Sequence, residues 1–175
     1  MTVAVYPGTF DPVHYGHIDI ATRASAMFEQ LVVGVYDRPM KNLLFSTEER
    51  VALAGRALAH LPNVTVVSYR GLTVAFTRQQ GASVMVRGLR VTYDFELEYQ
   101  MALTNKSLAS EVETVLLVTG LQYAFVSSSI VKEVALAGGC VDKMVPDFVQ
   151  ASMEEKLRAL GESSNDKVKV ISLRD

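Results

Sequence analysis

The sequence predicts an α/β fold built on a single doubly wound, five-stranded parallel sheet with additional C-terminal helices. Five short runs of β-branched and other apolar residues recur along the chain, at residues 3–5, 31–35, 64–67, 84–86 and 115–118. They are apolar throughout instead of alternating, which is typical of strands covered on both faces. Segments with helical spacing separate them. This alternation of strand and helix indicates right-handed crossovers with helices on both faces of the sheet.

The first two expected helices have clear signals. The first carries an apolar stripe at Ile20, Ala24, Met27 and Phe28. Ahead of the second, Ser46 and Glu49 have the spacing of a capping box, in which each side chain bonds the other's backbone N–H.

The later helices are marked mainly by their ends. A third, at about residues 73–80, is followed by Gly81, which suits a C-cap. A fourth, from about residue 94 to 110, carries the apolar residues Phe95, Leu97, Met101 and Leu108. Beyond the last strand we expect a helix near residues 130–138 and another opened by Pro146.

Length and composition exclude several classes of function. The 175 residues hold 17 Lys and Arg against 19 Asp and Glu, so the net charge of -2 argues against a protein that coats nucleic acid. The single cysteine, Cys140, excludes an internal disulfide framework and a thiolate metal cage. Neither a signal peptide nor a membrane helix is visible, so we expect a cytoplasmic protein with no membrane partner. We expect one domain over residues 1–160, followed by a tail at 161–175 that is either frayed or an added edge strand.

Residues after the first strand have the chemistry of a phosphate site. In doubly wound folds the ligand lies at the carboxyl ends of the strands. Here Gly8 allows close backbone approach, the Thr9 hydroxyl is a donor, and His17 begins a helix whose free N–H groups favour anions. The alternative is that Gly8 and Pro12 only shape a turn and that His14 and His17 only start the helix. No Gly-x-Gly-x-x-Gly fingerprint or Walker A loop occurs, so neither of those nucleotide sites is in use.

Cations follow two other strands. Lys41 lies in a loop after the second strand, where it is either a phosphate contact or a solvated surface lysine. Arg87 and Arg90 follow the fourth and can present two guanidinium forks to one polyphosphate. The alternative pairs these arginines structurally with Asp94, Glu96 and Glu98, and both can hold at once.

Three consecutive serines, at residues 127–129, precede a helical run after the fifth strand. A cap needs only one serine, so the run indicates another anion-binding helix N-terminus. Three phosphate-friendly turns thus fall on the same edge of the predicted sheet.

These motifs together resemble a known family. The stretch Gly-Thr-Phe-Asp-Pro with His-x-Gly-His, at residues 8–17, is similar to the signature of the nucleotidyltransferase superfamily, which has a Rossmann-like fold. With Arg-Gly-Leu-Arg, Asp-Phe-Glu, Ser-Ser-Ser and Val-Lys-Glu-Val-Ala, the chain from about residue 3 to 160 resembles the phosphopantetheine adenylyltransferases. The resemblance implies transfer of AMP from ATP to 4'-phosphopantetheine in bacterial coenzyme A synthesis, with Mg²⁺, a homohexamer and feedback inhibition by coenzyme A.

The resemblance also implies site residues by position. Contacts to phosphopantetheine fall on Thr9, Lys41, Thr73 and Arg87. Contacts to ATP fall on Thr9, Phe10, His17, Gly88, Leu89, Arg90, Glu98, Tyr123, Ala124, Phe125, Val126, Ser127, Ser128 and Ser129. Many family members have threonine at the position of His14, so the resemblance assigns His14 no role. The residue type at the position of Thr73 varies in the family, so we expect Thr73 to contact the substrate through its backbone.

The expected chemistry needs no enzymic nucleophile, because the acceptor phosphate is itself anionic. The catalytic groups are then His17, Lys41, Thr9 and Arg90, which position phosphates and stabilise charge. Mg²⁺ would be bound mainly by phosphates and water, with no protein metal site, since no acidic cluster suits a cage. Two alternatives stay open: a nicotinate mononucleotide adenylyltransferase, and a non-catalytic nucleotide-binding module.

Overall fold

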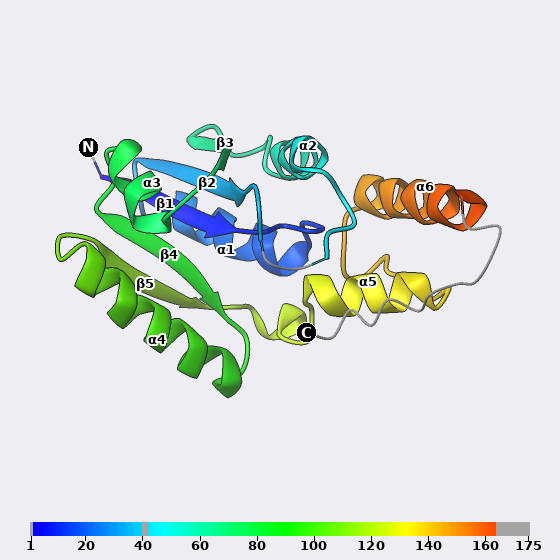
Figure 1. Cartoon of the computed structure of the whole chain (residues 1–175). Helices are drawn as coiled ribbons and strands as arrows, with labels where there is room; N and C mark the ends of the chain where they lie inside the picture. The colour runs from blue at the N-terminus through cyan, green and yellow to red at the C-terminus, as the bar shows by residue number, and fades with distance from the viewer. Residues whose placement is uncertain (1, 40–41, 164–175) are drawn as a thin grey trace.

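The computed structural model describes residues 2–39 and 42–163 (Figure 1). Strands and helices alternate along the chain until two helices close it. In order they are β1 (Val3–Gly8), α1 (Tyr15–Ser25), β2 (Gln30–Tyr36), α2 (Thr47–Ala57), β3 (Val64–Tyr69), α3 (Thr73–Gln79), β4 (Val84–Leu89), α4 (Thr92–Leu108), β5 (Glu113–Val118), η1 (Leu121–Tyr123), α5 (Ser128–Leu136) and α6 (Asp147–Ser163).

The five strands form one parallel sheet in the order β3-β2-β1-β4-β5, which confirms the predicted fold. The strand β1 lies at the centre, where Val5 pairs with Val32 of β2 on one side and with Met85 of β4 on the other. The chain therefore winds outward in both directions from β1. This switch point opens a crevice at the carboxyl ends of β1 and β4, where doubly wound folds bind ligands.

The helices α5 and α6 lie beside the sheet, not on it, at the end where the strands terminate (Figure 1). The helix α6 is fastened to α2 by the Lys156 ammonium, which lies 2.7 and 2.8 Å from the two Glu49 carboxylate oxygens. The Arg56 guanidinium also lies 4.2 Å from the centre of the Phe148 ring. These contacts hold α6 against α2. None of the helices in the described ranges combines the length and apolar composition that a membrane crossing requires.

Two helix-end predictions are confirmed. The Ser46 Oγ accepts from the Glu49 N–H at 3.2 Å, and the Glu49 carboxylate accepts from the Ser46 N–H at 2.7 Å, which completes the capping box. After α3, Gly81 adopts a φ of +67°, the left-handed conformation that glycine takes without strain. The tail prediction for residues 164–175 falls outside the described residues, and α6 continues to Ser163.

The apolar stripe predicted for the first helix is correct at Ile20 and Ala24, which are buried in α1, but wrong at Met27. The helix α1 ends at Ser25, so Met27 lies beyond it and is 56% exposed. The apolar residues expected on the fourth helix do occupy α4 but are about half exposed: Phe95, Leu97, Met101 and Leu108. Leu97, Met101 and Leu108 share one face of the helix and Phe95 lies on another, and α4 covers only one side of the outer strands (Figure 1).

Candidate active site

A cavity of about 660 Å³ opens at the carboxyl ends of β1 and β4. Most of the residues expected to bind phosphates line it, although they come from separate parts of the chain. They are Thr9, Phe10, His17, Thr73, Arg87, Gly88, Arg90, Glu98, Ser127, Ser128 and Ser129. The sheet topology thus brings the phosphate-friendly turns to one place.

The turn after β1 folds tightly around the Phe10 side chain. Phe10 has a φ of +52°, a conformation that costs a residue other than glycine about 1–2 kcal/mol. Its ring is buried, with its centre 5.5 Å from that of Tyr6 and 4.8 Å from that of His17. A Cβ on Gly8 would lie 2.9 Å from this ring, so only glycine lets it tuck beneath the strand end. The buried Phe10 ring therefore packs edge-on against the His17 ring and helps to hold it in place.

His14 and His17 cap the helix α1 by bonding each other's backbone. The His14 Nδ1 accepts from the His17 N–H at 3.4 Å, and the His17 Nδ1 accepts from the His14 N–H at 3.3 Å. An accepting Nδ1 carries no proton, so each neutral imidazole holds its proton on Nε2. Burial lowers the pKa of His14 to about 3, and the charge of Arg90 adds to the effect. His14 is thus a neutral cap beside His17.

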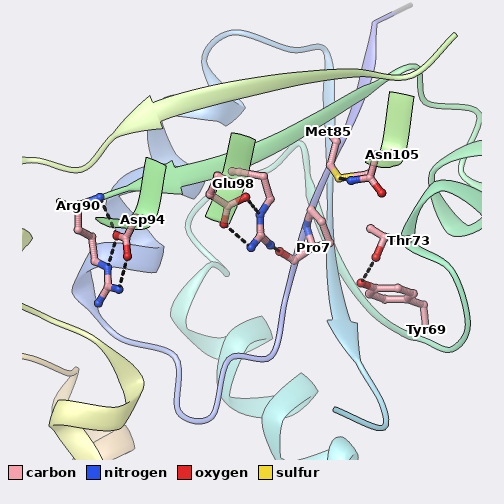
Figure 2. Close-up of polar contacts among 9 residues, drawn as sticks. Pro7, Tyr69, Thr73, Met85, Arg90, Asp94, Glu98 and Asn105 are labelled. Carbon is pink, nitrogen blue, oxygen red and sulfur yellow. Dashed lines mark hydrogen bonds and ion pairs between the residues drawn. The ribbon is translucent and has the colours of Figure 1, made fainter. Parts of the chain in front are cut away.

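Arg87 is held by Glu98 and by the end of β1 (Figure 2). Its Nε and Nη2 donate to the two Glu98 carboxylate oxygens at 2.8 and 2.6 Å, and its Nη1 donates to the Pro7 carbonyl at 2.6 Å. Burial acts to lower the pKa of Arg87, but the hydrogen bonds and charge of Glu98 outweigh it and raise the pKa. The guanidinium is therefore charged and fixed in orientation beside the cavity.

Arg90 is oriented in the same manner by Asp94 (Figure 2). Its Nε and Nη2 donate to the two Asp94 carboxylate oxygens at 2.9 Å each, and its Nη1 donates to the Val126 carbonyl at 3.2 Å. The pairing alternative is thus confirmed for Asp94 and Glu98, whereas the expected partner Glu96 lies on the exposed side of α4. Both arginines nevertheless line the cavity.

The serines at the start of α5 have divided roles. The Ser127 Oγ accepts from the Ile130 N–H at 3.2 Å and caps the helix. The Ser128 Oγ donates to the Pro12 carbonyl at 2.9 Å, which ties α5 to the loop after β1. One serine suffices as the cap, and all three line the cavity.

The remaining expected contacts lie elsewhere. Thr73 is at the cavity, with its hydroxyl 3.1 Å from that of Tyr69 (Figure 2). Lys41 falls outside the described residues. Five residues expected at ATP do not line the cavity: Leu89, Tyr123, Ala124, Phe125 and Val126. Of these five, Val126 supplies the carbonyl that accepts from Arg90, which lines the cavity.

A buried ion pair that sequence reasoning missed joins the helix α5 to the loop after β1 and to the loop before α2. Asp11 is 1% exposed and Lys132 is 7% exposed, and the Lys132 Nζ lies 2.8 Å from the Asp11 Oδ2. The same carboxylate accepts from the backbone N–H groups of Leu44 and Phe45 at 2.9 Å each. Nothing in the sequence distinguishes Lys132 from a surface lysine on α5, so only the fold reveals the pair.

No cluster of acidic, histidine or cysteine side chains suited to a metal ion occurs within the described ranges. The cavity's acidic residues Asp94 and Glu98 each accept two hydrogen bonds from an arginine. The acidic side chains that line the cavity are therefore already paired with arginines.

Comparison with known proteins assigns the chain to a family. A family model described as cytidylyltransferase-like matches residues 5–134. The phosphopantetheine adenylyltransferase of Desulforudis audaxviator (strain MP104C) is 51% identical over 162 residues, covering 93% of this chain and 99% of that protein. That of Heliobacterium modesticaldum (strain ATCC 51547 / Ice1) is 54% identical over 156 residues, covering 89% and 93%. The chain belongs to the phosphopantetheine adenylyltransferase family.

The fold of this phosphopantetheine adenylyltransferase family member extends to more distant proteins. The solved structure of a proposed nicotinate-nucleotide adenylyltransferase from Vibrio parahaemolyticus superposes with a TM-score of 0.65 at 15% identity. The match covers 88% of this chain and 99% of that one. The nucleotidyltransferase fold is thus shared well beyond the sequence similarity.

Proposed function

We propose that the protein transfers the AMP part of ATP to 4'-phosphopantetheine, which yields dephospho-coenzyme A and pyrophosphate. Membership of the family supports this activity, and one observation supports its assignment to the cavity. Two oriented arginines, Arg87 and Arg90, share a single cavity with Thr9, His17 and the serine turn at 127–129. Such an array suits two phosphorylated substrates lying side by side.

The reaction exchanges one phosphorus–oxygen bond for another. A phosphate oxygen of the acceptor attacks the α-phosphorus of ATP, the bond to the bridging oxygen breaks, and pyrophosphate leaves with the electron pair. The attacking oxygen is already anionic, so no base is needed. The protein's contribution is to place the two phosphates in line and to neutralise the charge that gathers between them.

The residues divide the work of positioning the phosphates and neutralising their charge, and Lys41 contributes to two of the groups. Arg87, together with Lys41 and Thr73, holds the acceptor. The Thr9 hydroxyl, the Nε2–H of His17 and Lys41 meet the α-phosphate. Arg90 and the serines at 127–129 hold the departing pyrophosphate. The residues Gly88, Leu89, Glu98 and the span 123–126 complete the nucleotide's surroundings, Glu98 by orienting Arg87.

Mg²⁺ fits this arrangement as a companion of ATP. The pairing of Asp94 and Glu98 with arginines supports a metal held by phosphate oxygens and water, as Mg²⁺ prefers. When bound, the ion would screen the polyphosphate's charge. Chelation with EDTA should therefore abolish turnover and leave the melting temperature of the nucleotide-free protein unchanged.

We also propose an assembly and a regulation, which the family resemblance and the helix α4 support. Its exposed apolar residues Phe95, Tyr99 and Leu103 recur every fourth position, so they form one stripe. Such a stripe supports burial against further copies of the chain, in a homohexamer. We further propose cytoplasmic location and feedback inhibition by coenzyme A, the end product whose pantetheine portion matches the acceptor.

An acceptor panel tests the activity. Purified protein with magnesium and ATP is offered 4'-phosphopantetheine, nicotinate mononucleotide or inorganic phosphate, and pyrophosphate release is measured. We expect release only with 4'-phosphopantetheine. Release with nicotinate mononucleotide alone would favour the related adenylyltransferase activity, and ATP binding without release for any acceptor would indicate a nucleotide-binding module.

A further inference from the structure

Arg50 of α2 is a fully buried arginine that does not line the cavity. Its Nη1 donates to two carbonyls, those of Thr9 and Tyr36, each at 2.8 Å. Its Nη2 donates to the Thr47 hydroxyl at 2.9 Å and to the Asp37 carbonyl at 3.3 Å. The guanidinium thus joins the turn after β1 to the end of β2.

All four of these acceptors are uncharged. Asp11, Asp37 and Glu48 lie near enough for their charges to oppose the lowering of the Arg50 pKa that burial causes. The Arg50 Nε is buried with no hydrogen-bond partner among the described residues. Burying a cation without a bonded carboxylate is costly, and an apolar side chain would fill the same space more cheaply. The contacts of Arg50 therefore point to a role besides packing.

The carbonyl of Thr9 is the contact that matters for the site. It precedes Phe10, whose φ of +52° holds the backbone in a strained conformation. Strained backbone persists only where its surroundings fix it, and it clusters at functional sites. Arg50 bonds this turn through the Thr9 carbonyl without lining the cavity, whereas Thr9 itself lines it. Holding the carbonyl restrains the backbone of Thr9, and the backbone sets the positions from which its hydroxyl can reach into the cavity.

We propose that Arg50 is a positioning residue that acts through Thr9, holding its backbone so that its hydroxyl faces the α-phosphate. This inference rests on the proposed function. Arg50 touches no substrate; its effect on turnover passes through the turn. The nearby Arg56, on the same helix but packed against the Phe148 ring, provides a matched control that lacks this connection.

A double-mutant cycle in turnover separates positioning from general support of the fold. Arg50→Gln should lower kcat by about 100-fold, the scale of a displaced catalytic group. Thr9→Ala should also lower kcat, and adding Arg50→Gln to it should cost less than about threefold more, because coupled residues are not additive. Arg56→Gln should leave kcat unchanged. Arg50→Lys, which keeps a donor for the carbonyls, should recover part of the loss. All rates are measured below each variant's melting temperature.

Several outcomes would overturn the proposal. If the fold-decreases in kcat caused by Arg50→Gln and Thr9→Ala multiply in the double variant, the two residues act independently. If Arg56→Gln lowers kcat as much as Arg50→Gln does, the effect of Arg50 is only support of the fold. Full turnover in Thr9→Ala would also contradict the proposal, because Arg50 is proposed to act through the Thr9 hydroxyl. Failure of the proposed function is a different result, in which the wild-type protein itself is inactive. Should Arg50→Gln not fold, Thr47→Val removes one partner of Nη2 and should show a smaller loss with the same coupling to Thr9.

Discussion

The imidazole rings of His14 and His17 stack with their centres 3.6 Å apart and their planes 21° from parallel. Each ring's Nδ1 is engaged by the other residue's backbone. A charge on His14 would lie buried near Arg90, so the folded protein keeps this histidine neutral. The two histidines therefore cap the helix α1 at the cavity, and their capping bonds require an unprotonated Nδ1 on each ring.

Stability should depend on pH through His14. The unfolded chain protonates His14 near its ordinary pKa of 6.5, whereas the folded protein resists protonation until about pH 3. Between these values the unfolded state binds more protons, so acidification lowers the free energy of unfolding by about 1 kcal/mol per pH unit. Urea denaturation across this range measures it. His14→Thr keeps a cap and should have a shallower slope; identical slopes would contradict the burial of a neutral His14.

Loss of His17 should impair transfer more than folding. His17→Ala removes a donor proposed to stabilise the α-phosphate, and loss of one such group costs about 100-fold to 1,000-fold in turnover. Pyrophosphate release at saturating substrates measures it, with circular dichroism to verify folding. The exposed third histidine supplies the control, since His60→Ala should turn over normally. A decrease of less than tenfold in His17→Ala would remove His17 from the mechanism.

Arg87→Lys should weaken acceptor binding although it keeps the charge. Lysine cannot make the paired hydrogen bonds to Glu98 together with that to Pro7, so its ammonium is not held in place. We expect KM for 4'-phosphopantetheine to rise about tenfold, equivalent to roughly 1.4 kcal/mol, with little change for ATP. Arg78→Lys is the comparison, because Arg78 pairs with Glu111 at the exposed surface. A selective rise in the KM for ATP would instead assign Arg87 to the nucleotide.

Charge on the exposed stripe of α4 should disrupt assembly. Tyr99 and Leu103 are 53% and 54% exposed, and a carboxylate there could not be buried against another copy. Light scattering should show Leu103→Glu shifting from an oligomer toward the single chain's 19.2 kDa. Leu136→Glu, at an equally exposed position on α5, should keep the wild-type mass. Unchanged mass for Leu103→Glu would place the subunit contact elsewhere.

The sequence predicts the parts of this molecule that depend on local patterns. Buried parallel strands have uninterrupted apolar runs, and Ser46 with Glu49 caps α2 because both partners lie within one turn. The strand-end rule also anticipates that Arg87, Arg90 and Thr9 meet at one cavity. These conclusions require only chain order and the handedness of the crossovers.

Other features depend on contacts between distant segments. Arg50 follows the capping box of an amphipathic helix and resembles a surface residue, yet it bonds Thr9 across 41 positions of sequence. Lys132 reaches Asp11 over 121 positions. Apolar spacing on α4 likewise gives no sign that a helix covering an outer strand leaves half of each side chain exposed. Burial of a charge and exposure of an apolar face are both decided by packing.

The ion pairs of Arg87 with Glu98 and of Arg90 with Asp94 also shape how the cavity attracts its ligands. Each pair has no net charge, so its field declines with distance much faster than that of a lone cation. These two pairs therefore attract anions from the surrounding solution only weakly, and under the proposed function a phosphate that enters meets guanidinium groups whose orientation is already fixed. Under the proposed function, selection among the many phosphorylated molecules of a cell would then rest on shape at contact and depend little on ionic strength.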